Sequence, residues 1–131
     1  PVYSVQFHDS ADGDLTGSSN LLFQNNVLSI GGGLTLSRRY TDVSITASVT
    51  DYYIGIGTTN NPVALTLPSA TLLGNGQTYV VKDEGGASNI NNITILASGE
   101  ETIDNQNSIV LESPYASIQL YCNGSNKFFI C

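Results

Sequence analysis

The sequence has little of several residue types that functional sites often need. Its 131 residues include no tryptophan, no methionine, one histidine, two cysteines and four basic residues against eleven acidic ones, for a formal net charge of −7. A nucleic-acid groove needs a stripe of basic side chains that displaces counterions from phosphates, and an anionic membrane surface attracts the same side chains. We therefore expect neither nucleic acid nor an anionic membrane among the partners of this chain.

Long apolar runs are missing as well. No window approaches the roughly 18 consecutive apolar residues of a membrane-spanning helix, and the N-terminus has neither the basic nor the apolar region of a secretory signal peptide. We expect no membrane insertion. Because the chain begins at Pro1, we expect a processed product or a piece of a longer protein.

The shortage of histidine and cysteine restricts catalytic and metal-binding chemistry. A Ser-His-Asp or Cys-His arrangement would have to use His8, and one His with two distant Cys does not make a zinc site. Asp9, Asp12 and Asp14 lack the spacing of a calcium-binding loop, so we interpret them as turn-forming residues. The sequence predicts no catalytic residue, no metal site and no cofactor.

Paired acids are the one remaining pattern that could support hydrolysis. The pairs Asp83-Glu84 and Glu100-Glu101 are the residue types that cleave glycosidic bonds. Neighbours in a strand point to opposite faces, so neither pair is expected to converge on one substrate. A polysaccharide-degrading module is therefore an alternative interpretation, not the main one.

The two cysteines, Cys122 and Cys131, are too few for a disulfide framework. They belong to a predicted final hairpin of residues 117–122 and 127–131. If Cys122 lies opposite Lys127, Cys131 lies opposite Ile118, roughly 13 Å away along the strand, which is too far for a disulfide. We expect two buried free thiols, with a bridge between chains as the alternative.

The positive signals are those of β-strands. Apolar and polar residues alternate over 43–49 and 63–67, and one possible helical turn spans 69–73. Short strands at about ten-residue spacing predict a sandwich or barrel and not βαβ units. The other predicted strands of this part are 79–81, 92–96, 108–111 and 116–121.

The first 37 residues form a segment of a different kind. Very short strands, at 4–7, 20–23 and 26–30, are separated by turn residues. Such strands cannot bury their apolar faces within one chain, because an isolated hairpin is marginal in water. Another chain is the natural cover. We place the boundary with the remaining residues, 38–131, at Arg38-Arg39.

Residues 76–86 (GQTYVVKDEGG), 91–95 (NNITI) and 102–104 (TID) follow one another in the second part. This succession resembles a domain of viral fibre proteins, including bacteriophage tail and head fibres, in which KDESG precedes NNITI, TIDG and a terminal hairpin. Gly85 stands where the family usually has Ser, and Asn105 where it usually has Gly. Residues 50–54 with 65–68 are similar to the TDYIV and TVTLP of the same family.

The first part also resembles viral fibres, in this case their stalks. It is similar to a pattern S-x-Q-F, S-x-N-L-x-F and N-x-L-x-I-G, in which three chains interlace short strands around an axis. The spacing before Asn20 is not the usual one. The matching residues are Ser4, Gln6, Phe7, Ser18 or Ser19, Asn20, Leu21, Phe23, Asn26, Leu28, Ile30 and Gly31.

Together the resemblances imply an all-β homotrimer with an interlaced stalk, residues 1–37, and a jelly-roll-like β-sandwich head, residues 38–131. They imply a virion-surface protein, assembled in the host cytoplasm, that joins other virion proteins through an adjacent N-terminal region. It would attach to a host receptor or glycan without enzymatic activity. The side chains expected in the trimer interface are Phe7, Leu21, Phe23, Leu28, Ile30, Leu34 and Leu36.

Tyrosines are the candidate receptor-binding residues, since a ring beside short polar side chains often builds a shallow sugar site. We select Tyr52, Tyr53 and Tyr115, which lie on or beside predicted strands. The competing interpretation is that most of the seven tyrosines pack in the core or between chains. A purely structural trimerisation or capsid-decoration module is then the alternative function.

Overall fold

The computed structural model describes residues 21–131. The chain divides into two compact units, Pro1–Thr35 and Leu36–Cys131, and we describe each by itself. The sequence placed the boundary two residues later, between residues 37 and 38. Ser37 belongs with the second unit because its carbonyl accepts a hydrogen bond from the Tyr53 amide at 2.9 Å.

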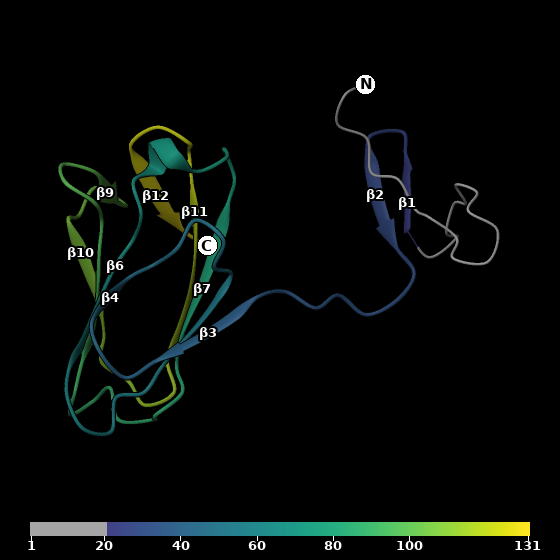
Figure 1. The fold of residues 1–131 in the computed structure, drawn as a ribbon. Coiled ribbons are helices and arrows are strands. Elements are labelled where there is room, and N and C mark those ends of the chain that lie inside the picture. Colours follow the sequence, from purple (N-terminus) through teal and green to yellow (C-terminus); the bar gives the residue numbers. More distant parts are fainter. Residues whose placement is uncertain (1–20) are drawn as a thin grey trace. The chain divides into compact units, whose positions relative to one another are not determined.

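The described part of the first unit is a hairpin of β1 (Leu21–Gln24) and β2 (Val27–Ile30) (Figure 1). Its two-residue turn has φ of 53° at Asn25 and 62° at Asn26. Positive φ at both positions is the requirement of a type I′ turn, which Asn tolerates better than most residues. The hairpin forms a two-stranded sheet of its own.

The second unit consists of two sheets packed face to face (Figure 1). The six-stranded sheet has the order β3-β5-β7-β11-β12-β9 and the four-stranded sheet the order β10-β8-β6-β4. The strands are β3 (Arg38–Thr41), β4 (Ile45–Thr46), β5 (Tyr53–Ile56), β6 (Val63–Thr66), β7 (Thr78–Asp83), β8 (Ile93–Leu96), β9 (Thr102–Ile103), β10 (Ser108–Leu111), β11 (Ser117–Cys122) and β12 (Lys127–Ile130).

From β3 to β8 the chain alternates between the two sheets. Consequently β3, β5 and β7 run parallel in one sheet, and β4, β6 and β8 run parallel in the other. Parallel neighbours need a long crossover, which is usually a helix. Here each crossover contains a strand of the opposite sheet, so the chain passes from one sheet to the other and back in successive turns.

This topology corrects one expectation from the sequence. A jelly roll is built of antiparallel strands, whereas five of the eight strand pairs of this unit are parallel and three are antiparallel. The all-β class and the two sheets were predicted correctly. The strand order was not, because an alternating pattern shows which face of a strand is buried but not which strand is its neighbour.

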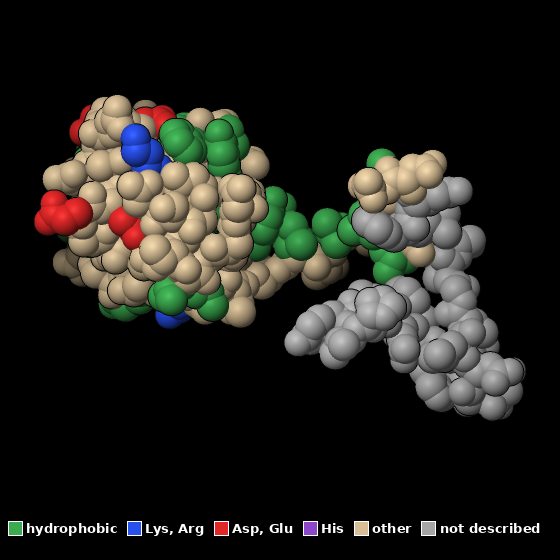
Figure 2. Space-filling model, turned by 90° about the horizontal axis from the view of Figure 1, so that it is seen from above, with side chains coloured by type: hydrophobic (Ala, Val, Ile, Leu, Met, Phe, Trp, Pro, Cys, Tyr) green, Lys and Arg blue, Asp and Glu red, His purple; other side chains and the backbone are tan. Residues whose placement is uncertain are grey.

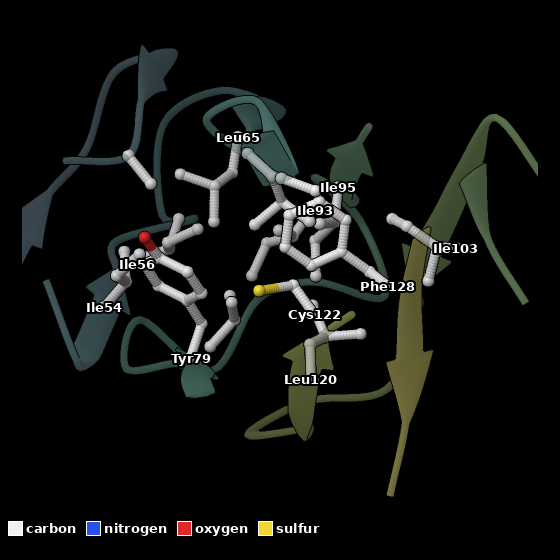
Figure 3. Close-up of a cluster of buried hydrophobic side chains, with 14 of the residues drawn as sticks. Ile54, Ile56, Leu65, Tyr79, Ile93, Ile95, Ile103, Leu120, Cys122 and Phe128 are labelled. Atoms are coloured by element: carbon white, nitrogen blue, oxygen red, sulfur yellow. The ribbon is translucent and has the colours of Figure 1, made fainter. Parts of the chain in front are cut away.

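The core lies between the sheets, and the alternating patterns account for it (Figure 3). In β6, Val63 and Leu65 are buried, while Ala64 between them is half-buried. In β7, Tyr79 and Val81 are buried in the same way. Other fully buried side chains are Ile54, Ile56, Ile93, Ile95, Ile103, Leu120 and Phe128.

The structure corrects one local prediction, a long strand, and confirms another, a helical turn. The alternation over 43–49 predicted a long strand, but only β4 forms, because Asp51 accepts the Ser48 amide at 2.8 Å and turns the chain away. The helical turn is confirmed as a 3₁₀ turn, η1 (Ala70–Leu72), with Ser69 as its N-cap. In the described part of the chain no helix is long and apolar enough to cross a membrane.

The final hairpin is present, with a register one residue away from the one assumed. Cys122 lies opposite Phe128, and the Cys131 amide donates to the Gln119 carbonyl at 3.0 Å. Both cysteines are free, as expected. Cys122 is buried, but Cys131 is exposed, because the shifted register places it beside Gln119, which faces solvent.

Tyr79 contributes a buried hydroxyl to this core. The hydroxyl donates to the Ser48 carbonyl at 3.0 Å. Burial, with a smaller contribution from Asp51 and then Cys122, raises the pKa of Tyr79 to about 12. A raised pKa in the folded state means that the neutral phenol stabilises the fold below the unfolded pKa of about 10, and that this stabilisation is lost as the pH rises through the folded pKa.

We predict that Tyr79→Phe lowers the free energy of unfolding at pH 7 by about 1 kcal/mol, the usual contribution of one buried hydrogen bond. Between about pH 10 and 12, urea unfolding of the variant should depend less on pH than that of the original protein. Parallel pH profiles of the two proteins in this range would contradict the assignment.

Candidate functional site

Asp83, the last residue of β7, is a fully buried carboxylate. Its Oδ1 accepts hydrogen bonds from the Thr58 hydroxyl at 2.8 Å and the Gly86 amide at 2.9 Å. Its Oδ2 accepts bonds from the amides of Ser88 and Tyr115, both at 3.1 Å. The donors belong to loops 57–62, 84–92 and 112–116, so one carboxylate joins three loops at one end of the second unit.

The same hydrogen bonds determine the protonation state of this carboxylate. Burial alone would raise the pKa of Asp83, but the bonds from Thr58, Ser88 and Gly86 outweigh burial and lower the pKa below its usual value. The group therefore remains ionised in the folded protein at neutral pH. Its charge is satisfied by oriented donors and not by a cation.

Tyr115 occupies a fixed and unusual position on one of these loops. Its φ of 60° lies in the left-handed region, which a bulky residue rarely adopts. Its amide binds Asp83, and its carbonyl accepts a hydrogen bond from the Lys82 ammonium. The residue is 63% exposed. The backbone is thus held from both sides while the ring faces solvent.

Gly86 allows the ring of Tyr115 to lie in this place. It has a φ of 71°, and a Cβ on it would lie 2.3 Å from Cζ of Tyr115. The ring therefore covers a position where every other residue would clash. The Lys82 Nζ lies 5.8 Å from the ring centroid, within the range of a cation–π contact.

Lys82 also lines a shallow groove of about 330 Å³, the outer groove, on the solvent face of the six-stranded sheet. Pairing of Tyr53 with Val80 and of Gly55 with Lys82 places these residues on the floor of the groove. Ser117 lies opposite Lys82 on β11. The lining residues are Arg38, Tyr53, Ile54, Gly55, Val80, Lys82, Glu84 and Ser117.

One wall of the outer groove is an ion pair. Arg38 Nε donates to Glu84 Oε1 at 3.0 Å, and its Nη2 contacts the other carboxylate oxygen. The hydrogen bond with Glu84 raises the pKa of Arg38 above its ordinary value. The Glu84 carboxylate lies over Gly55, where a Cβ would come within 2.2 Å of Oε1. Glycine at this position thus leaves room for the Glu84 carboxylate on the groove floor.

The structure brings two of the three candidate tyrosines towards one site. Tyr53 lines the outer groove and is 44% exposed, and Tyr115 contacts Lys82, which lines the same groove. Tyr52 is half-buried and meets the Tyr53 ring edge-on at a centroid distance of 4.8 Å. Tyr52 therefore supports Tyr53 and is not itself a groove residue.

The apolar residues predicted for a trimer interface lie mainly in the first unit. Leu28, Ile30 and Leu34 are 58%, 40% and 63% exposed. Leu21 and Leu36 are half-buried. Phe7 and the side chain of Phe23 lie outside the described residues.

Three of the four paired acids, Asp83, Glu84 and Glu101, are engaged in contacts within the chain. Asp83 is buried and Glu84 is on the outer face, so this pair diverges as predicted. Glu101 accepts the Ser69 hydroxyl at 2.6 Å and the Ala70 amide at 3.0 and 3.1 Å, at the start of η1. Within residues 21–131 no group of three His, Cys, Asp or Glu side chains could hold a metal ion.

Sequence reasoning missed most of the outer groove. Lys82 directly follows the predicted strand 79–81 and is not among the predicted site residues, although the alternation in β7 indicates that it faces outwards with Val80. Arg38 was treated as part of a boundary. Its partner Glu84 is 46 residues away, and no local pattern indicates a contact over that separation.

Comparison with known proteins gives no assignment: no family model and no curated protein sequence matches the chain.

We predict that Asp83→Asn lowers the free energy of unfolding at pH 7 by about 3 kcal/mol, because an amide NH₂ then faces backbone donors. The depressed pKa of Asp83 adds stability above the unfolded value of about 3.9, and this is lost as the pH falls through the folded pKa. Unfolding of the original protein should therefore be more sensitive to pH below about 4 than that of the variant. Equal acid sensitivity would contradict this role.

Proposed function

We propose that this chain is a non-enzymatic component of a viral fibre, a homotrimer on the virion surface that attaches to glycans of the host cell. The observation that carries the proposal is the apolar face of the β1–β2 hairpin. Pairing of Leu21 with Ile30 places both residues on one face, and Leu28 shares this face because it lies two positions before Ile30 in β2. They were expected in a trimer interface from the resemblance to fibre stalks.

This hairpin has too few contacts of its own to be stable alone. It has four residues in each strand, and within residues 21–131 its strands pair only with each other. A two-stranded hairpin is marginally stable at best in water. Burying one large apolar side chain contributes about 1.5–3 kcal/mol, so covering Leu28 and Ile30 with other copies would stabilise the segment substantially. A threefold arrangement also follows the preference of oligomers for closed symmetry.

The second unit supports the attachment role. Figure 2 shows a face on which most of the surface of this unit is uncharged, with few acidic and basic side chains. The outer groove offers an exposed ring, Tyr53, beside hydroxyl and charged groups, and Tyr115 lies next to it through Lys82. Rings with neighbouring short polar groups suit shallow sugar sites. Three such sites in one trimer would gain from multivalency.

Two alternatives remain. The first is a purely structural trimerisation or capsid-decoration module, which would need the same apolar face but no ligand in the outer groove. The second is a polysaccharide-degrading tail module. It has less support, because Asp83 is buried and Glu101 caps η1.

We predict a native mass by light scattering near three times 13.9 kDa for the full chain. Replacing Leu28 and Ile30 together by Asp should give monomers or disordered aggregates, since charges would then lie on the apolar face. As a matched control, Val27→Asp changes a residue on the opposite face of the hairpin and should leave the mass unchanged. A monomeric, folded full chain would exclude the trimer.

We predict that the full chain binds glycans on a mixed-glycan array. Tyr53→Ala or Tyr115→Ala should weaken binding about two- to tenfold per site, the effect of one lost aromatic contact. Tyr121→Ala, which removes an exposed ring outside the groove, serves as the control. A trimer that binds cells but no glycan would exclude glycan attachment. A trimer that binds neither would favour the structural module.

A further inference from the structure

We propose that the outer groove selects sugars that carry a carboxylate, and that Lys82 binds this group. The inference rests on the proposed glycan attachment and deepens it by naming the class of sugar. Uronic acids and sialic acids share the required chemistry. The charges of the groove, the contacts of the Lys82 ammonium and the neighbouring rings support this inference.

The charge of the outer groove differs in sign from that of the whole protein. Only four basic residues occur in the sequence, against a net charge of −7, yet two of them, Arg38 and Lys82, line this one groove. Glu84 is the single acidic lining residue. The groove therefore carries one net positive charge on a negative protein, which favours an anionic ligand at this place.

Arg38 and Lys82 differ in how much of their charge is already engaged. Arg38 binds Glu84 through two nitrogens, so these two charges largely compensate each other. The two ion pairs within the described part of the chain do not include Lys82. Its ammonium has three donors, of which one binds the Tyr115 carbonyl. This contact holds the Lys82 side chain in place, and the two remaining N–H donors can bind a ligand.

The surroundings of Lys82 match the other features of an acidic sugar. Ser117 lies directly opposite Lys82 in the sheet and adds a hydroxyl for the same carboxylate or a neighbouring sugar hydroxyl. Tyr53 on one side and Tyr115 on the other offer rings for the apolar face of a pyranose. The volume, about 330 Å³, is near the lower end for small-ligand sites and suits one or two sugar units.

Glu84 has a specific part in this selection. Its carboxylate covers the floor at Gly55, beside the strand position of Lys82. It would repel the carboxylate of a ligand if Arg38 did not neutralise it. Replacing Glu84 by Gln removes the repulsion and releases Arg38 for the ligand, so this variant should bind acidic sugars more tightly than the original protein does.

The test measures binding of the full chain to two matched pairs of probes by surface plasmon resonance at low salt. One pair is trigalacturonic acid and its methyl ester, and the other is sialyllactose and lactose. We expect at least one acid to bind about fivefold more tightly than its uncharged partner, as one partly exposed charge pair allows. The pair that shows the preference identifies the source of the carboxylate.

Lys82→Met keeps the length and apolar stem of the side chain but removes its charge, and it should abolish the preference. Lys127→Met makes the same change at the other lysine, which lies outside the groove, and should retain the preference. Lys82→Arg should restore it. If Lys82→Met does not fold, as judged by circular dichroism, Glu84→Gln still tests the proposal through the predicted increase.

Three results would overturn the inference. If the original protein binds acids and uncharged partners equally, the groove recognises sugars without selecting acids, and glycan attachment is retained. If the preference persists in Lys82→Met, another group binds the carboxylate. If the protein binds none of the four probes, the inference fails, and the glycan array then decides separately whether attachment to glycans also fails.

Discussion

The buried carboxylate of Asp83 is the interaction on which the organisation of the second unit most depends. A buried charge without partners would be costly, so its four donors must be in place whenever the unit is folded. Those donors fix loops that are widely separated in sequence, and through Tyr115 they fix an exposed ring. One side chain thereby connects the three loops at this end of the unit.

The outer groove depends on the same strand. In β7, Tyr79, Val81 and Asp83 point inwards, while Val80 and Lys82 point outwards. The inward-facing residues of β7 are thus buried, and the outward-facing Val80 and Lys82 line the groove. A one-residue change of register in β7 would exchange them and would bury Lys82. The stability of the core therefore also specifies the position of the groove.

The sequence was sufficient for local structure and insufficient for long-range pairing. Alternation correctly predicted the buried residues of β6 and β8, and turn chemistry accounts for Asp104 and Asn105, whose φ values of 46° and 65° form the tight turn after β9. Alternation could not show that β5 lies between β3 and β7, nor that Arg38 meets Glu84. These contacts depend on the topology of the sheets, which no local pattern encodes. Residues 1–20 lie outside the described structure.

The alternation of strands between the two sheets has a consequence for the order in which the unit can form. From β3 to β8 no strand pairs with its neighbour in sequence, and the long edge of β7 is completed only by β11. Non-local pairing of this kind slows folding, because long loops must close before contacts form. During synthesis from the N-terminus, the second edge of β7 must therefore wait, unpaired, for β11, which lies close to the end of the chain. The unit should fold late and as a whole, after the segment that precedes it has already left the ribosome.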